Sequence, residues 1–380
     1  MGDSTPDAAD VSDSTPSAPR LARYFEAMVK ADASDLHLKP SLPPHLRIGG
    51  QIRSAQGKAL SNEDILSMVD EMMTDKQRAI FAEMGSVDMA YELPGSDRFR
   101  INVFLQRGEV AAAVRRVTRS IPDFKSLHLP PIVEKIASER QGLVLLSGPT
   151  GGGKSTTLAA MLQHINQTRA CHIVTLEDPI EYLYEGDKAL VSQREIGIDT
   201  LDFQTALKYV FREDPDVVLI GELRDYDTFS AALQVAETGH LVLGTVHASR
   251  APQTVGRLMD LFPPEARDRV RQLIGFNLRA VICQKLLPSI SKDADMVPAC
   301  EVMLMDHHIR KLVSEGRDAD LEDAIRSHEL EGMQTFAKSL CDLIDAGLIE
   351  PRVAYDAAPD LDELQMMLTG ISASRAGLRG

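Results

Sequence analysis

The chain has few cysteines, and none of them forms a metal-binding or disulfide pattern. There are four in 380 residues, Cys171, Cys283, Cys300 and Cys341, with no Cys-x-x-Cys pair among them. This spacing argues against a zinc ribbon and against a disulfide framework. We therefore expect reduced thiols packed inside the protein.

Long apolar runs and a secretory leader are also missing. No apolar run is long enough to cross a bilayer, and residues 1–19 are rich in Asp, Ser, Thr, Pro and Ala without an apolar core. We expect residues 1–19 to be a disordered acidic tail. The chain is expected to be cytosolic, with no segment inserted directly into a membrane.

Positive charge is scarce as well. The 41 Lys and Arg residues stand against 56 Asp and Glu, which gives a formal net charge of −15. This charge repels nucleic-acid phosphates over long range, and no extended basic segment interleaved with aromatic residues offsets it. A nucleic-acid partner is therefore not expected, and a DNA-translocating motor is disfavoured.

The composition that remains, 44% hydrophobic and 26% charged, is typical of a soluble globular protein, and 380 residues suffice for two or three domains. Three prolines in residues 119–131 indicate an interdomain linker. The predicted parts are an α+β domain (20–118), that linker, an α/β domain (132–285), a helical C-terminal region (286–370) and a flexible tail (371–380).

The elements of the first predicted domain follow from apolar spacing and turn residues. A helix is expected over residues 21–29, and a second, long amphipathic helix is expected from Ser61 to about Met84. The predicted strands are 35–39, 45–48, 87–93, 98–106 and 110–117.

In the second predicted domain, apolar strands alternate with helical segments. The strands are 142–147, 173–176, 217–220 and 241–246. Such alternation predicts a mainly parallel sheet covered by helices. From about residue 264 onward the pattern is largely helical.

The most informative segment follows the first of these strands and precedes a helical segment. It consists of Gly148, Pro149, Thr150, Gly151, Gly152, Gly153, Lys154 and Ser155. Glycines let backbone N–H groups surround a β-phosphate, Lys154 bridges phosphates, and the Ser155 hydroxyl can ligate Mg²⁺. Thr156 lies one step along the helix, next to these ligands. The segment predicts a site for ATP or GTP.

Hydrolysis requires a carboxylate that orients or deprotonates water. Glu222 follows the strand 217–220, at the carboxyl end where open parallel sheets bind ligands. Gly221 precedes it where many such ATPases have Asp, so a Mg²⁺ carboxylate must come from elsewhere. The segment at the end of the strand 173–176 supplies three candidates, Glu177, Asp178 and Glu181. The alternative for Glu222 is a carboxylate that stabilises a helix N-terminus.

His247 stands at the carboxyl end of the strand 241–246, on the predicted nucleotide side. A histidine there can contact a γ-phosphate, and it can equally be a hydrogen-bonded polar residue of the core. His240, at the opposite end of the strand, is a weaker candidate.

The first predicted domain carries a group of arginines. Alternation along 98–106 puts Arg98 and Arg100 on one face and the apolar residues Phe99, Ile101, Val103 and Leu105 on the other. With Arg115 and Arg116 nearby, we expect a basic face. Such a face is often simply solvated, but in an ATPase ring it could supply arginines to a neighbouring subunit's nucleotide.

Taken together, these segments resemble the secretion ATPases of the type II/type IV pilus superfamily, and within it the pilus retraction (twitching motility) ATPases, over nearly all of residues 21–370. The segments that carry the resemblance are 33–38 with 42–44, the P-loop, Ile173–Tyr184, Ser192–Glu195, Arg212–Asp225, and the His box from Ala236 to Ala248.

This resemblance implies a PAS-like α+β domain, a RecA-like P-loop ATPase domain and a homo-hexameric ring that hydrolyses ATP with Mg²⁺. It also implies a catalytic carboxylate at Glu222, Glu177 and Asp178 near Mg²⁺ and water, a γ-phosphate sensor at His247, and first-domain arginines acting across subunits. The implied partner is an inner-membrane pilus platform protein, with the ring at the cytoplasmic face.

Several alternatives stay open at this point. A pilus or secretion assembly ATPase would share every site residue, and a catalytically silent ring component would bind ATP without turnover. Residues 276–281 and 332–336 resemble the accessory PilU-type paralogue, whereas Arg212–Pro215 keeps the form of the principal PilT-type motor. The sequence thus leaves open whether a paralogous retraction ATPase must accompany the chain.

Overall fold

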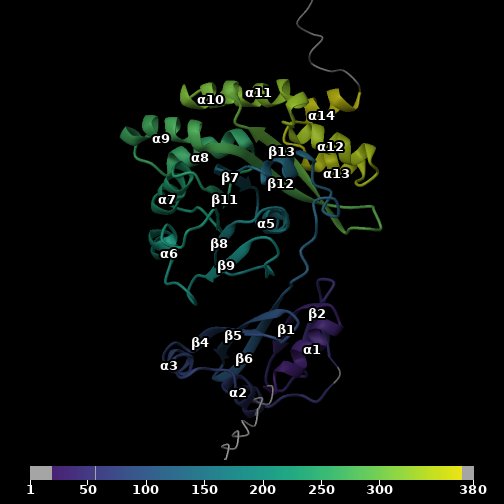
Figure 1. Ribbon diagram of the computed structural model, residues 1–380. Helices are drawn as coiled ribbons and strands as arrows, with labels where there is room; N and C mark the ends of the chain where they lie inside the picture. The colour runs from purple at the N-terminus through teal and green to yellow at the C-terminus, as the bar shows by residue number, and fades with distance from the viewer. Residues whose placement is uncertain (1–18, 56, 370–380) are drawn as a thin grey trace, which may run out of the picture. The chain divides into compact units, whose positions relative to one another are not determined.

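The computed structural model describes residues 19–55 and 57–369 (Figure 1), so nearly all of both predicted tails lies outside the described residues. The chain divides into two compact units, Met1–Thr118 and Arg119–Gly380.

The first unit is an antiparallel sheet with helices. Its six strands lie in the order β3-β2-β1-β6-β5-β4. Their bounds are Ala33–Leu38 (β1), His45–Ile48 (β2), Gln51–Ser54 (β3), Ser86–Glu92 (β4), Arg98–Gln106 (β5) and Glu109–Val117 (β6). The helices are Ala22–Lys30 (α1), Asn62–Asp70 (α2) and Asp75–Met84 (α3).

One side of this sheet packs into a single core. Phe25 of α1 stacks on Phe99 of β5 with ring centroids 4.4 Å apart, and Ile65 and Met68 of α2 join the same cluster. Phe99, Ile101 and Val103 are buried as predicted. The expectation is wrong for Leu105, which is 48% exposed because it lies past the core near the end of β5.

The predicted long helix from Ser61 to Met84 is two helices, α2 and α3. Thr74 interrupts it with extended backbone, and its hydroxyl accepts a hydrogen bond from the Gln77 N–H while the Gln77 side chain accepts from the Thr74 N–H. This reciprocal cap begins a new helix at Asp75, with four residues between the end of α2 and the start of α3. The amphipathic spacing continued through the break and concealed it.

The second unit is built on a seven-stranded sheet in the order β13-β12-β7-β11-β10-β8-β9. The strands are Gly142–Ser147 (β7), His172–Glu177 (β8), Leu190–Glu195 (β9), Val217–Ile220 (β10), Leu241–Val246 (β11), Leu278–Pro288 (β12) and Met296–Leu304 (β13). All neighbours are parallel except β12 and β13.

Helices follow most strands of this sheet. They are Ile132–Ala137 (α4), Lys154–Thr168 (α5), Phe203–Val210 (α6), Tyr226–Glu237 (α7), Ala251–Asp260 (α8), Pro264–Asn277 (α9), His307–Ser314 (α10), Leu321–Ser327 (α11), Phe336–Asp345 (α12), Pro351–Ala357 (α13) and Leu361–Leu368 (α14). No helix within residues 19–55 and 57–369 combines the length and the apolar character that a bilayer span requires.

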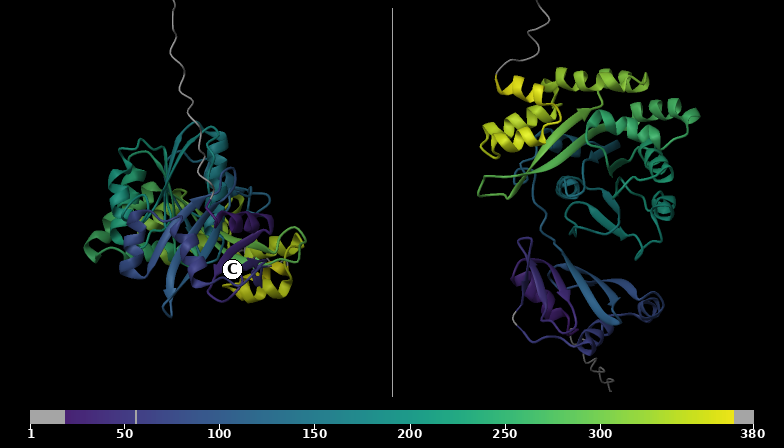
Figure 2. Two further views of the ribbon diagram at one scale, coloured as in Figure 1. Left: turned by 90° about the horizontal axis from the view of Figure 1, so that it is seen from below. Right: turned by 180° about the vertical axis from the view of Figure 1, so that it is seen from behind.

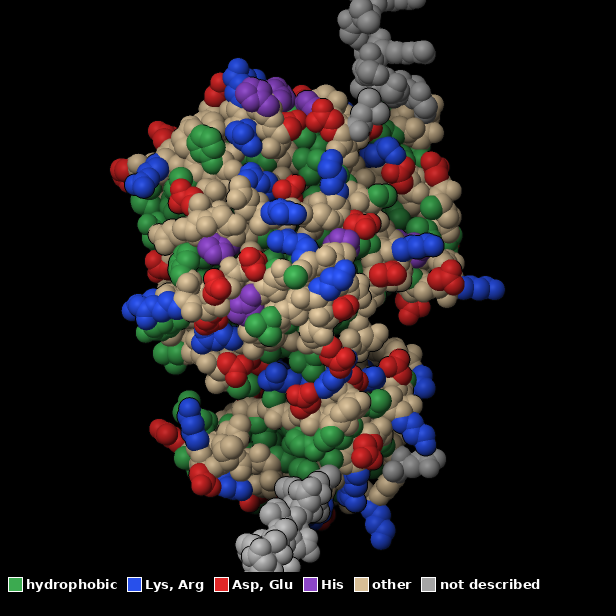
Figure 3. Space-filling model, viewed as in Figure 1, with side chains coloured by type: hydrophobic (Ala, Val, Ile, Leu, Met, Phe, Trp, Pro, Cys, Tyr) green, Lys and Arg blue, Asp and Glu red, His purple; other side chains and the backbone are tan. Residues whose placement is uncertain are grey.

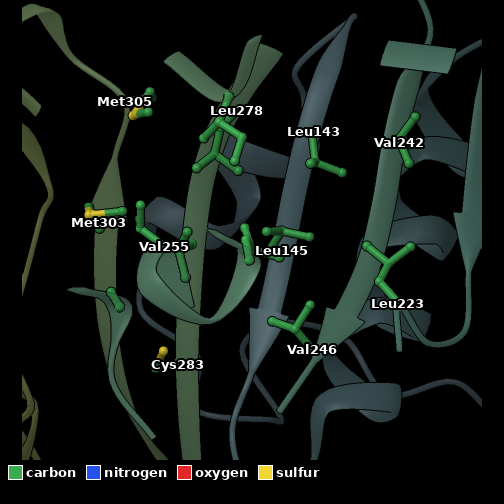
Figure 4. Packing of buried hydrophobic residues seen from close by; sticks show 14 of the residues in the cluster. Leu143, Leu145, Leu223, Val242, Val246, Val255, Leu278, Cys283, Met303 and Met305 are labelled. Carbon is green, nitrogen blue, oxygen red and sulfur yellow. The ribbon is translucent and has the colours of Figure 1, made fainter. Parts of the chain in front are cut away.

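The central strands are buried on both faces, as a parallel sheet between two helical layers requires. Every residue of β7 and of β11 is buried. Leu143 and Leu145 face a core that includes Val242 and Val255 of α8 (Figure 4), whereas Val144 and Leu146 face a second core with α4 and α5. The alternation along β7 therefore supplies both cores.

The region after residue 264 is largely helical as predicted, with α9 to α14, but the sequence prediction missed two strands within it. β12 pairs with β7 and extends the sheet, and β13 returns beside it as a hairpin next to α12 and α13 (Figure 2, right). The apolar run Ala280–Cys283 is buried throughout and suits either a helix or a strand by periodicity. Pairing with β7 and β13 makes this run a strand.

The surface in Figure 3 carries acidic and basic side chains interspersed with one another. The face drawn there presents neither sign alone.

We predict that Thr74→Ala weakens α3 by removing its N-terminal cap. Loss of such a cap costs about 1 kcal/mol. Amide hydrogen exchange in residues 75–84 should become about fivefold faster. Lys76→Ala, an exposed change on the same helix, is the control. Unchanged exchange in Thr74→Ala would show that the cap does not hold this helix.

Candidate nucleotide site

The glycine-rich loop connects β7 to α5, as predicted. Gly148, Gly151 and Gly153 have φ angles of 138°, 75° and 82°, a region that disfavours other residues. α5 begins at Lys154, so its free N–H groups open toward the loop. The loop thus provides the concave, partly positive surface that suits a phosphate.

Lys154 lies inside this loop. It is 8% exposed, and its ammonium donates to the carbonyl oxygens of Gly148 and Pro149, each at 2.9 Å. Burial lowers the pKa of Lys154, and the nearby Glu222 and Glu181 oppose that change. The lysine is therefore held by weak neutral acceptors that an entering phosphate can replace.

Gln284 of β12 supports the loop from beneath, a contact that no local sequence pattern predicts. A Cβ at Gly148 would lie 2.2 Å from the backbone carbonyl oxygen of Gln284. A Cβ at Gly153 would lie 2.6 Å from the side-chain Nε2 of Gln284. The Gln284 Oε1 also accepts a hydrogen bond from the Thr157 hydroxyl at 2.8 Å. The close approach of β12 thus explains two of the loop's glycines.

A cavity of about 480 Å³ opens above the loop. This volume suits a nucleotide-sized ligand. Its lining includes Thr150 through Thr156 and four further residues proposed from the sequence, Glu177, Asp178, Glu222 and His247. The structure therefore brings the predicted residues of four strand ends together, although their roles stay predictions.

Glu177 is the most buried carboxylate of the cavity, at 8% exposed. Its Oε1 accepts hydrogen bonds from the Thr175 hydroxyl at 2.7 Å and from the Gln193 amide at 3.3 Å. Burial raises the pKa of Glu177 to about 7, and these hydrogen bonds limit the rise. The carboxyl can thus exchange a proton near neutral pH.

Glu222 lies in the opposite kind of environment. Its Oε2 accepts a hydrogen bond from the Arg224 guanidinium at 2.6 Å, and its Oε1 lies 3.0 Å from His247 Nε2. The hydrogen bond from Arg224 lowers the pKa of Glu222, and the contact with His247 lowers this pKa further. Glu222 is therefore ionised at neutral pH.

Gly221, which precedes Glu222, lies close to the end of β8. A Cβ at Gly221 would lie 3.3 Å from the Leu176 carbonyl oxygen and 3.4 Å from Glu177 Cα. A side chain at position 221 would thus fit only tightly against the end of β8. The backbone it approaches there carries Glu177 and Asp178.

Two further residues refine the predicted set. The Thr156 hydroxyl lies 3.0 Å from the Tyr182 hydroxyl, so Thr156 contacts a side wall of the cavity. His240 Nδ1 lies 3.0 Å from the Val235 carbonyl oxygen and does not line the cavity.

Sequence reasoning missed Arg224, Tyr182 and Gln284. Arg224 stands two residues after Glu222 in a segment that carried the family resemblance, so a charge so close to a proposed base was a usable signal. Tyr182 and Gln284 reach the site through long-range packing, 26 and 127 residues from their partners Thr156 and Thr157. No local sequence pattern predicts such contacts.

The predicted basic face of the first unit is divided between two faces of the sheet. Arg100 pairs across strands with Arg115, whereas Arg116 pairs with Phe99, whose side chain lies in the core. Because directly opposed residues share a face, Arg116 cannot belong with Arg100 and Arg115. Arg98 follows Arg100 by alternation.

The arginines on the two faces also differ in their ion-pair partners and in their exposure. Arg116 is 16% exposed and pairs with Asp97 and Asp32. Arg115 contacts Asp35 at 3.0 Å but is 73% exposed, and Arg100 lies 3.9 Å from Asp88. Arg116 is thus a structural residue, whereas Arg100 and Arg115 remain accessible in the isolated chain.

Comparison with known proteins identifies relatives over most of the chain. A family profile described as type II/IV secretion system protein matches residues 10–333. The type IV pilus retraction ATPase PilT of Pseudomonas aeruginosa is 41% identical over 329 residues, 87% of this chain and 95% of that protein. The type IV pilus ATPase PilU of the same organism is 36% identical, covering 91% of this chain and 90% of that protein.

The fold also matches a solved structure. The crystal structure of the pilus retraction motor PilT with bound ADP superposes with a TM-score of 0.83 at 42% identity, covering 91% of this chain and 98% of that one.

We predict a pH-dependent stability effect at Glu177. In the unfolded chain this carboxyl ionises near 4.5, and in the folded chain near 7, so its stabilising contribution is complete below pH 4.5 and is lost as the pH rises to about 7. Glu177→Gln should therefore lose less stability between pH 4.5 and 8 than the wild type, by roughly 3 kcal/mol.

The measurement is urea unfolding of the nucleotide-free chain across this range. Thr175→Val removes a hydrogen bond to the carboxylate and is expected to change the pH dependence in the opposite direction. Identical pH dependence in Glu177→Gln and wild type would contradict the assignment.

Proposed function

The chain belongs to the type II/IV secretion system protein family, and on that premise we propose that it is an ATP-hydrolysing motor that drives type IV pilus retraction. The observation that carries the proposal is the meeting of the P-loop, Glu222 and His247 in one cavity. The chain is similar to a retraction ATPase along 95% of that protein's length, which supports the same function.

The cavity is suited to ATP with Mg²⁺. Ser155 at the start of α5 and the carboxylates of Glu177 and Asp178 line one space, and oxygen donors of this kind are the ligands that Mg²⁺ prefers. Ser155, Asp178 and Glu177 would hold the ion. When bound, Mg²⁺ neutralises charge on the phosphates.

The remaining steps belong to the protein's own side chains. The loop N–H groups and Lys154 bind the phosphates, and Lys154 exchanges its two carbonyl acceptors for phosphate oxygens. Glu222, ionised and at the rim of the same cavity, orients the attacking water and accepts its proton.

In the nucleotide-free chain, Glu222 is engaged by two side chains. Arg224 and His247 both contact its carboxylate. A triphosphate is a stronger anionic partner than one carboxylate, so its arrival draws His247 toward the γ-phosphate and frees Glu222 for water. This exchange gives His247 the role of γ-phosphate sensor.

We further propose a homo-hexameric ring in which Arg98, Arg100 and Arg115 reach the nucleotide of the neighbouring subunit. Guanidinium groups supplied in this way stabilise transition-state charge. Arg116 is left out of this set because its partners Asp97 and Asp32 already hold it within its own unit. Closure of one interface then strains the others, and the ring fires in sequence.

The implied partner is a pilus platform protein of the inner membrane, and the ring would lie at the cytoplasmic face of that membrane. An accessory role beside a paralogous motor is a second candidate, favoured by the similarity to PilU over 91% of this chain. Part of the segment that resembles that paralogue has a folding role, because Thr335 caps α12 and the Gln334 N–H bonds to Val302.

A strain that lacks this chain is expected to assemble pilus fibres and fail to retract them. Wild type and Glu265→Gln, an exposed change on α9, should restore retraction, whereas Glu222→Gln should not. In the purified chain, phosphate release by Glu222→Gln should fall about 10²- to 10⁴-fold.

Loss of the fibres themselves would instead indicate an assembly motor. Equal phosphate release by Glu222→Gln and wild type would remove Glu222 from its proposed role. Restoration of retraction only when a paralogue is also supplied would favour the accessory function.

We predict that the arginines act between subunits. Lys154→Ala should abolish nucleotide binding, and Arg100→Ala combined with Arg115→Ala should lower turnover by about 10³- to 10⁵-fold. Mixed rings of these two variants should regain turnover, because some interfaces then combine an intact P-loop with intact arginines from the neighbour.

The matched control mixes Lys154→Ala with Glu222→Gln. These two changes damage the same protomer's site, so their mixture should stay inactive. If both mixtures remain inactive, the arginines do not act in trans.

A further inference from the structure

A partly buried cation near the nucleotide site takes no part in the proposed reaction. Arg250 precedes α8 and is 15% exposed. Its guanidinium forms a bidentate pair with Glu322 of α11, with N–O distances of 2.8 and 2.9 Å. It also lies 3.0 Å from Glu301 of β13, whose side chain is fully buried. One side chain thus joins three elements of the second unit.

Glu301 fixes this cation in place. Its Oε1 accepts from Arg250, and its Oε2 accepts from the Ala251 N–H at 2.5 Å. Both oxygens therefore hold the same turn of chain, where α8 begins. Glu322, at 30% exposed, is the outer of the two carboxylates and can be changed without leaving Arg250 unpaired.

The turn of chain before α8, residues 247–250, begins in the nucleotide site. Only Ala248 and Ser249 separate Arg250 from His247, which contacts Glu222. The Ser147 hydroxyl donates to the Ala248 carbonyl oxygen at 2.7 Å and accepts from the Ala248 N–H at 2.9 Å. Ser147 directly precedes the P-loop. Residues 247–250 are thus bonded to the nucleotide site at one end and to α11 at the other.

Further charges continue the connection from α11 to α14. Arg326, one turn after Glu322 on α11, lies 3.7 Å from Glu322 and donates to Glu363 of α14 at 3.0 Å. Glu363 is only 9% exposed. In Figure 1, α11 and α14 lie next to each other in the C-terminal part of the unit. Solvent screens such partly buried pairs much less than surface pairs.

We propose that Arg250 is a positioning residue that couples His247 to α11 and α14, so that nucleotide binding shifts these C-terminal helices. The inference rests on the proposed function in one respect, that His247 responds to the γ-phosphate. A guanidinium fork fixes both distance and direction, so movement of the 247–250 turn must either carry Glu322 along or break two hydrogen bonds. Sites become coupled when both act on one such element.

The test uses the full chain with Glu322→Gln and the slowly hydrolysed analogue ATPγS. The matched control is Asp323→Asn on the same helix, which removes a pair with Arg326 but does not contact Arg250. Amide hydrogen exchange is measured in residues 321–327 and 361–368, with residues 148–160 as an internal report of nucleotide binding.

In the wild type and in Asp323→Asn, ATPγS should change exchange in α11 and α14 by about two- to thirtyfold, the range typical of coupled sites. Glu322→Gln should lose this response while residues 148–160 stay protected. Arg250→Lys keeps the charge but not the fork, and it should lose the response as well. Glu322→Asp should recover part of it.

If ATPγS still changes hydrogen exchange in α11 of Glu322→Gln, the inference is wrong. It is also wrong if, in the wild type, ATPγS protects residues 148–160 but leaves exchange in α11 and α14 unchanged. Absence of protection at residues 148–160 in the wild type would instead contradict the proposed nucleotide-driven function itself. The two failures are therefore distinguishable.

Discussion

The alignment of parallel strand ends is the constraint on which the rest of this protein depends. Ser147 of β7 lies opposite Val246 of β11, and Ile220 of β10 lies opposite Leu176 of β8. Because these strands run in the same direction and stop in step, the residues that follow them meet at one edge of the sheet. The P-loop, Glu177, Glu222 and His247 gather there although a hundred residues of chain separate the first from the last.

The edge gives its two main carboxylates opposite surroundings. Burial raises the pKa of Glu177 to about 7 although its hydrogen bonds oppose the rise, whereas Glu222 lies between Arg224 and His247, and its pKa is lowered. Pairs of carboxyl groups with separated pKa values are typical of sites in which one group stays ionised and the other can carry a proton. In this family fold, the neighbouring strand ends create that difference.

The C-terminal part of the chain is integrated into this site. β12 lies beside β7, and Gln284 fills the space beneath the P-loop so closely that Gly148 and Gly153 tolerate no side chain. β13 supplies the buried Glu301, and the helices after it supply Glu322 and Glu363. A change in the shape of the loop therefore has short physical routes toward the C-terminal helices. Those routes pass through strands as well as helices.

The sequence by itself determined the P-loop, the parallel core and the residues of the strand ends, because each of these depends on local chemistry: glycine backbone freedom, continuous apolar runs, and carboxylates or histidine directly after a strand. It also placed Phe99, Ile101 and Val103 in a core through simple alternation. Only the tertiary structure decided that β12 and β13 are strands, that Arg116 faces away from Arg100 and Arg115, and that Arg224, Gln284 and Arg250 touch the site or its supports. These outcomes depend on which segments pair across long stretches of chain, and pairing energy of that kind leaves no periodic trace in the sequence.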